Sequence, residues 1–156
     1  MNLSVRPALL GERGRLAQIV ELQDNFLRCE KEIALEVIDD SFDTSQGYNL
    51  QVAACAGKIA GFMVFGPIPL TEKRYDLYWI AVDPRQGRRG IGSLLLLHME
   101  RIIADMGGGH IYVDTSSTQG YQRARSFYEK HDYLPAAHLE DFYRDGDDRI
   151  IYCKRC

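Results

Sequence analysis

The sequence predicts a single-domain α/β protein with a central mixed β-sheet and helices on both of its faces. An apolar run at residues 77–82, a helical pattern from Ile91 to Met106 and a second apolar run at residues 110–115 form a strand–helix–strand unit. Such a crossover connects two parallel strands. An ordinary hydrophobic content of 46% in 156 residues suits one core, so we expect one domain over residues 1–156. The element order indicates roughly six to seven strands and about four helices.

The first third of the chain predicts one short strand and two helices. Residues 3–6 form the strand, which Pro7 closes. Residues 12–27 and 30–42 each show apolar side chains at helical spacing, and Glu30 lies in the first turn of the second helix. Residues 44–47 are polar and predict a loop.

A β-hairpin is predicted next. Residues 50–55 and 59–65 are apolar runs on either side of Ala56-Gly57-Lys58, which is a turn signal. Residues 66–74 contain two prolines and predict an extended loop. The strand at 77–82 follows, and it ends before Pro84, which has no N–H to give to a neighbouring strand.

The last third predicts a strand, a helix and two further strands. Glycines 107–109 end the preceding helix, and residues 110–115 form a strand. Residues 116–118 are a polar helix entry, and the helix runs to about Lys130. Residues 133–138 and 150–154 are the final strands, separated by an acidic segment at 141–148 that we expect to be a loop.

Composition excludes several classes of function. The net charge of −3 disfavours general nucleic-acid binding. No apolar run approaches the length of a membrane span, and the first residues lack the apolar core of a signal peptide. Of the four cysteines only Cys153 and Cys156 have C-x-x-C spacing, and no second pair of cysteines or histidines at ligand spacing accompanies them, so we expect no metal. All four cysteines read as reduced thiols, which indicates a cytoplasmic protein.

The glycine- and arginine-rich turn between residues 82 and 93 predicts a phosphate site, because free N–H groups at a helix start favour an anion. It is not a P-loop, since Ser93-Leu94 stands where Lys-Ser or Lys-Thr is required. It is not a dinucleotide fingerprint either, because Leu95 occupies the third glycine position.

The stretch 82–95, Val-Asp-Pro-Arg-Gln-Gly-Arg-Arg-Gly-Ile-Gly-Ser-Leu-Leu, resembles motif A of the GNAT acetyltransferases. That resemblance implies that backbone amides of the turn and first helical turn hold the pyrophosphate of CoA. Aligned on Gly90, the family's Arg/Gln position falls on Gly87, which removes one side-chain contact. The residues implied to contact acetyl-CoA here are Ile80, Ala81, Val82, Gly87, Arg88, Arg89, Gly90, Ile91, Gly92 and Ser93.

Residues 124–133, Ala-Arg-Ser-Phe-Tyr-Glu-Lys-His-Asp-Tyr, resemble motif B of the same family. Asp132 replaces the family's glycine, and Asp tolerates a left-handed turn. Tyr121 stands where the family has an asparagine. Tyr121, Ala124 and Phe127 are the further cofactor-binding residues that the resemblance implies. Several shorter segments resemble a little-characterised bacterial GNAT subgroup, and this resemblance does not indicate which substrate is acetylated.

The resemblance implies direct transfer of acetyl from CoA to an amine. A splayed or bulged strand would leave a backbone N–H to polarise the thioester carbonyl, which maps to residues 80–82. Tyr128 sits at the position of the family's general acid; its alternative role is aromatic packing. Asp76 or Glu72 could remove the amine proton through water, and the same residues also suit a solvated surface. Carboxylates at Asp141, Asp147 and Asp148 are further alternatives.

The sequence therefore predicts an acyltransferase, an acetyl-CoA-dependent N-acetyltransferase of class EC 2.3.1.-. Its acceptor is a primary amine of a small molecule or a protein, and the carboxylates mildly favour a cationic one. We expect acetyl-CoA as cosubstrate and no nucleic-acid or membrane partner; a homodimer stays open. The alternative is a non-catalytic acyl-CoA-binding or regulatory module on the same fold.

Overall fold

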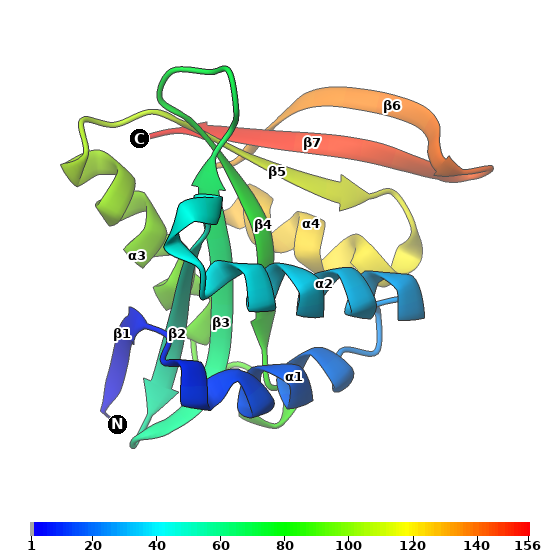
Figure 1. Ribbon diagram of the computed structural model, residues 1–156. Helices are drawn as coiled ribbons and strands as arrows, with labels where there is room; N and C mark the ends of the chain where they lie inside the picture. The colour runs from blue at the N-terminus through cyan, green and yellow to red at the C-terminus, as the bar shows by residue number, and fades with distance from the viewer. Residues whose placement is uncertain (1) are drawn as a thin grey trace.

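The computed structural model describes residues 2–156, in which seven strands form one sheet in the order β1-β2-β3-β4-β5-β7-β6 (Figure 1). The strands are β1 (Leu3–Pro7), β2 (Asn49–Cys55), β3 (Lys58–Pro67), β4 (Arg74–Val82), β5 (His110–Ser116), β6 (Leu134–Arg144) and β7 (Asp147–Arg155). The helices are α1 (Arg13–Glu21), α2 (Arg28–Ser41), α3 (Ile91–Asp105) and α4 (Gln122–Lys130). The predicted mixed sheet is confirmed.

Each face of the sheet is covered by two helices, because each face carries its own apolar core. In Figure 1, α1 and α2 lie in front of the sheet and α3 and α4 lie behind it. Leu16 and Ile19 of α1 pack with Phe62 of β3 on the first face. Leu95 of α3 and Tyr128 of α4 belong to the core of the second face. The alternation of β3 side chains between the two cores follows from the two-residue repeat of a strand.

Strands β4 and β5 are parallel, as the predicted crossover requires, but they pair only briefly. The paired residues run from Arg74 opposite His110 to Asp76 opposite Tyr112, and within residues 2–156 no further pair joins them. Figure 1 shows the two strands running apart beyond this point. The edge of β4 that faces β5 is consequently unpaired from Leu77 onward.

A β-bulge lies in β4 just after the strands part. In the pairing of β3 with β4, Val64 lies opposite Trp79, whereas Phe65 lies opposite Leu77. Tyr78 is therefore the extra residue on β4. A bulge disturbs the ladder locally and increases the strand's twist. Between Asp76 and Tyr78, β4 therefore both separates from β5 and gains extra twist.

The first helix is shorter than predicted. The sequence pattern predicts a helix over 12–27, but α1 ends at Glu21. The Gln23 side chain donates to the Ile19 carbonyl at 2.9 Å and to the Val82 carbonyl at 3.0 Å, and it ties the chain leaving the helix to the end of β4. Phe26 then packs edge-to-face on Trp79 at 5.3 Å between ring centroids. These tertiary contacts outweigh the helical periodicity.

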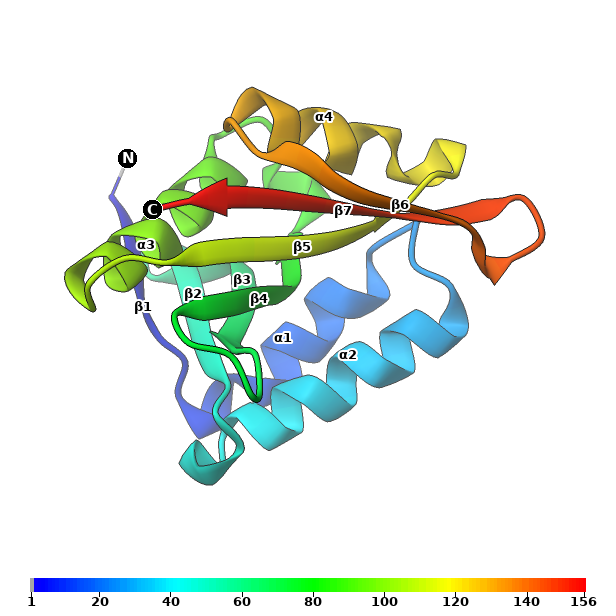
Figure 2. The same ribbon diagram turned by 90° about the horizontal axis from the view of Figure 1, so that it is seen from above.

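The predicted loop at 141–148 is wrong, because most of it is strand. β6 continues to Arg144 and β7 begins at Asp147, so only Asp145 and Gly146 form the turn. Gly146 has a φ of +81°, and an Asp-Gly pair is a strong hairpin signal. The sequence thus contained the signal. Figure 2 shows this β6–β7 hairpin extending beyond the rest of the molecule.

Candidate functional site

The glycine turn between β4 and α3 exposes the start of a 15-residue helix. Gly90 is the N-cap of α3, with a φ of +74°, and a Cβ placed there would meet no atom within 4 Å. Arg88 is also left-handed, with a φ of +63°. Open space in front of the first helical N–H groups, together with the helix dipole, suits a phosphate.

Asp83 fixes this turn to the body of the protein. Its carboxylate accepts hydrogen bonds from Arg85 Nη2 at 2.8 Å and from Arg15 Nη2 at 2.6 Å, and only 1% of its side chain is exposed. Arg85 and then Arg15 hold the pKa of Asp83 well below its usual value. Arg85 is thus engaged within the turn, and the side chains of Arg85, Arg88 and Arg89 are all exposed and supply positive charge. An Asp directly before a proline in the first position of a helix is a capping signal, and this signal could have identified Asp83 as a residue that holds the turn.

The start of α3 meets the end of α4. The Phe127 ring lies 3.5 Å from where a Cβ on Gly92 would be, which is an ordinary van der Waals distance, so the ring lies against the first turn of α3. Ser93 Oγ and His131 Nε2 form a hydrogen bond of 2.8 Å. His131 also contacts Phe127, with 4.8 Å between ring centroids. The sequence did not single out His131 as a site residue, because its partner Ser93 is 38 positions away.

Tyr128 is a buried phenol without a fixed partner. Its ring packs against those of Phe127, Tyr133 and Tyr152. Its hydroxyl has no hydrogen-bond partner among the residues that the structure describes, whereas those of Tyr133 and Tyr152 donate to Glu100 and Glu129. Burial raises the pKa of Tyr128, so the hydroxyl keeps its proton at neutral pH and remains a donor.

The other residues implied by the motif B resemblance lie on α4 or within two residues of its ends. Ala124 and Phe127 pack against the core on the α3 face. The Tyr121 hydroxyl donates to Glu30 Oε1 at 2.7 Å, which joins the start of α4 to α2. Burial and then this hydrogen bond raise the pKa of Tyr121. Asp132, at the family's glycine position, has a φ of +67° and thus adopts the expected left-handed conformation.

The backbone implied to bind the thioester lies on the unpaired edge of β4. Ile80, Ala81 and Val82 pair with β3 on one side, and their other edge faces the space left by β5. The bulge itself is at Tyr78, two residues earlier than the mapped segment. The Tyr78 ring packs edge-to-face on Tyr48, with 5.1 Å between centroids. Tyr78 is therefore a site candidate that only the strand register reveals.

Of the two proposed bases, Asp76 lies where β4 and β5 part, and Glu72 lies exposed in the preceding loop. Asp76 is partly buried. Burial, followed by the negative charge of Asp114, raises its pKa, and Arg149 opposes this rise. A carboxyl group with a raised pKa at the point where two strands diverge has the character of a general base. Asp114 and Arg149 form an ion pair of 2.7 Å with each other, and both act electrostatically on Asp76.

The acidic residues of the final hairpin serve its folding. Asp141 accepts from the Gly146 amide at 2.7 Å, and Asp148 bonds to His138 at 2.6 Å. Asp147 is buried and pairs with Arg144 and the Ser116 hydroxyl. These partners give each carboxylate a structural role in the hairpin. The three residues are therefore weaker candidates for the general base than Asp76.

Comparisons with known proteins agree on one family. The model of the acetyltransferase (GNAT) family matches residues 16–133. A GNAT-family protein from Desulfovibrio desulfuricans is 33% identical, with 99% of both chains covered and a TM-score of 0.93. No curated protein sequence matches the chain. Within residues 2–156, no helix is long and apolar enough to cross a membrane.

More distant solved structures share the fold. The ribosomal-protein-S18-alanine N-acetyltransferase of Escherichia coli is 21% identical, with 99% of this chain and 94% of that chain covered and a TM-score of 0.77. The PaiA N-acetyltransferase of Thermoplasma acidophilum, solved in complex with coenzyme A, is 20% identical over 100% of both chains, with a TM-score of 0.75.

Proposed function

The chain belongs to the acetyltransferase (GNAT) family, and from this premise we propose that it transfers the acetyl group of acetyl-CoA to a primary amine. One observation carries the proposal: the exposed start of α3 lies directly beyond the strand whose edge β5 has left unpaired. A diphosphate held at the helix start would place an extended thiol arm along that edge. The coenzyme A complex of the T. acidophilum relative supports this choice of cosubstrate.

The residues proposed to hold the cosubstrate divide by chemistry. Backbone N–H groups from Arg88 to Ser93 would face the pyrophosphate, whereas the Gly87 N–H donates to the Pro84 carbonyl at 3.3 Å. The exposed Arg88 and Arg89 side chains would add charge. Residues 80–82 would run beside the thiol arm, with Tyr121, Ala124 and Phe127 on the side of α4. No side chain needs to be displaced at Gly90, where the space is open.

The transfer itself requires one nucleophile, one base and one acid. The nitrogen of a neutral amine attacks the thioester carbonyl carbon, a C–N bond forms, and the C–S bond then breaks. Asp76 takes the amine proton through water, and the unpaired backbone of β4 near the bulge stabilises the carbonyl oxygen as it becomes negative. The departing thiolate takes a proton from Tyr128, whose hydroxyl has no competing partner within residues 2–156. Asp76 then releases the amine proton to water, and water reprotonates Tyr128, so both groups return to their starting states.

The test compares two buried tyrosines that differ in their hydroxyl partners. Tyr128→Phe should lower kcat by about 100-fold while leaving the Kd for CoA unchanged. Tyr152→Phe is the matched control, because it removes a hydroxyl bonded to Glu129 from the same aromatic cluster. Calorimetry gives the Kd, and release of free thiol in the presence of an amine library gives turnover. Equal turnover of Tyr128→Phe and wild type would remove Tyr128 from the mechanism.

The same experiment tests the alternative of a non-catalytic acyl-CoA-binding module. Such a module would bind CoA but release no thiol with any amine, and Tyr128→Phe would change nothing. The acceptor classes are a small-molecule amine and a protein amine, and the library should contain both. None of the four cysteines forms a disulfide within residues 2–156, which is typical of a reducing compartment, so we place the reaction in the cytoplasm.

A further inference from the structure

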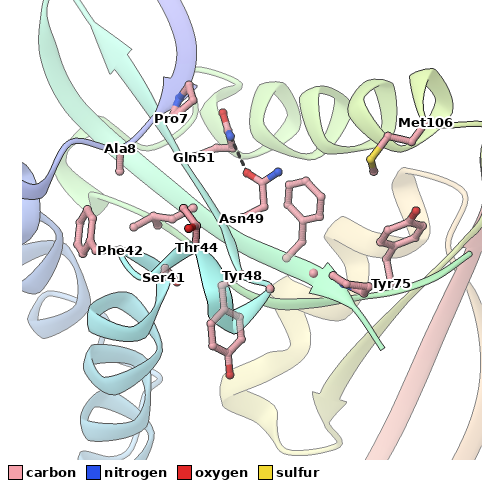
Figure 3. Close-up of a pocket in the computed structure, with 15 residues that line it drawn as sticks. Pro7, Ala8, Ser41, Phe42, Thr44, Tyr48, Asn49, Gln51, Tyr75 and Met106 are labelled. Carbon is pink, nitrogen blue, oxygen red and sulfur yellow. Dashed lines mark hydrogen bonds between the residues drawn. The ribbon is translucent and has the colours of Figure 1, made fainter. Parts of the chain in front are cut away.

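A pocket of about 670 Å³ lies at the end of the sheet opposite the glycine turn. It opens where β2 begins and β3 ends, between the last turns of α2 and α3 (Figure 3). The glycine turn, by contrast, follows the other end of β4. The pocket is therefore separate from the proposed cosubstrate site, and filling it would not obstruct the turn.

The lining of the pocket is uncharged. No Asp, Glu, Lys, Arg or His contributes to it, although such residues make up more than a quarter of the chain. Most of the wall is apolar or aromatic, and its largest side chains are Phe42, Tyr48, Phe65, Tyr75 and Met106. Ionic ligands such as phosphates and alkylammonium groups would lose their hydration here without gaining an ionic partner. Flat apolar molecules would instead gain contact with rings on several sides.

One polar group in this wall has an unmade hydrogen bond. Gln51 is 5% exposed, and its Nε2 donates to Asn49 Oδ1 at 2.6 Å. Its Oε1 is buried and has no hydrogen-bond partner among residues 2–156. Figure 3 shows the Gln51–Asn49 bond, with the free oxygen pointing away from Asn49. A buried acceptor without a donor is unfavourable, and native proteins rarely leave one.

We propose that this pocket binds an uncharged, flat aromatic molecule that donates one N–H to Gln51 Oε1. The volume falls within the usual range for small-molecule sites, roughly 300–1,000 Å³. The last torsion of a glutamine side chain is broad, so the amide can turn to present its buried oxygen to a donor in the pocket, and this turn exchanges the hydrogen bond from Nε2 to Asn49 Oδ1 for the one to the ligand. The proposal is independent of acetyl transfer, because none of the residues assigned to that reaction lines the pocket.

Indole and benzofuran form a matched pair of probes for this site, because benzofuran has the same shape but carries oxygen in place of the N–H. Each would be titrated into the ¹⁵N-labelled full-length protein and followed by NMR. Indole should shift the Gln51 side-chain amide and the backbone amides around the pocket. Its Kd should be about tenfold lower than that of benzofuran, the usual effect of one hydrogen bond to a buried group.

Gln51→Leu should reduce the indole-to-benzofuran ratio to about one, since a single hydrogen bond accounts for the roughly tenfold preference. Gln51→Met serves as a second variant should the first fail to fold, and the dispersion of the ¹⁵N amide spectrum reports on folding in both. Gln18→Leu, on the exposed face of α1, is the control and should keep the ratio. Equal affinity of the two probes for wild type, an unchanged ratio in both Gln51 variants, or a crystal with water on Oε1 beside bound indole would each overturn the proposal. Loss of CoA binding or turnover would bear on the proposed function alone.

Discussion

Arg15 on α1 donates to the Asp83 carboxylate at 2.6 Å, although the two residues are 68 positions apart in the chain. The same guanidinium bonds the Ile59 carbonyl at 3.0 Å. Arg15 therefore fastens the strand end that precedes the glycine turn to a helix on the opposite face of the sheet from α3. The turn is held in position before any ligand arrives, which reduces the entropy lost on binding.

Asp83→Asn should lower the free energy of unfolding at pH 7 by about 2 kcal/mol, because it leaves the partly buried guanidinium of Arg15 without its counter-charge. This loss is smaller than for a fully buried ion pair, because the second partner of Asp83, Arg85, is 66% exposed and water can solvate its charge in the variant. Urea unfolding measures the change. Asp39→Asn is the control: it breaks an exposed ion pair with Arg13 and should change stability by less than about 0.5 kcal/mol. Equal effects of the two substitutions would contradict the role of Asp83.

The Asp83 contribution should also depend on pH. Its pKa is lowered in the folded protein, so the stability it adds is complete above the unfolded value, about 3.9, and is lost as pH falls through the folded value. The stability difference between wild type and Asp83→Asn should accordingly be constant from pH 5 to 7 and shrink below about pH 4. Urea midpoints at three pH values check this. A difference that grows on acidification would refute the assignment.

Gly90→Glu should weaken CoA binding by at least about 100-fold, because a carboxylate would occupy the phosphate position. The matched control is Gly57→Glu. Gly57 has a φ of +78° and open space around its Cβ position, like Gly90, but it lies in the β2–β3 turn. Both variants should lose similar stability, and only Gly90→Glu should lose CoA affinity in calorimetry. Retained affinity in folded Gly90→Glu would exclude the turn as the phosphate site.

Asp76→Asn should lower kcat/KM by about 100-fold or more if Asp76 is the base. The acid limb of the wild-type pH profile should lie above the ordinary Asp pKa, since the base must lose its proton and its pKa is raised. Asp114→Asn should move that limb to lower pH, because it removes a repelling charge, and Arg149→Gln should move it to higher pH. A limb that neither substitution moves would assign the base elsewhere.

Ser93→Ala and His131→Phe should each raise the Kd for CoA by about five- to tenfold, because one hydrogen bond joins these side chains at the proposed phosphate site. The effects should not add in the double variant, since each substitution breaks the same bond. Calorimetry on the four proteins completes the cycle. Additive effects would mean that His131 acts on its own and does not position Ser93.

Features that depend on near neighbours in the chain were predictable. The β2–β3 hairpin, the strand–turn–helix from β4 to α3 and the parallel pairing of β4 with β5 follow from apolar runs, glycines and prolines within short windows. The Asp145-Gly146 turn belongs to the same class, although the acidic stretch around it suggested a loop. Asp132 in a left-handed conformation is likewise a local property of its residue type.

The sequence by itself determined the sheet, its order of helices and strands, and the glycine turn with its family resemblance, because these arise from local periodicity and backbone freedom. Only the tertiary structure decided that β4 bulges at Tyr78 and parts from β5, that Asp83 is held by Arg15, and that Asp76 lies near Asp114 and Arg149. Strand register, burial and charge–charge distance are set by residues far apart in the chain. No short stretch of the sequence contains both partners of such a contact.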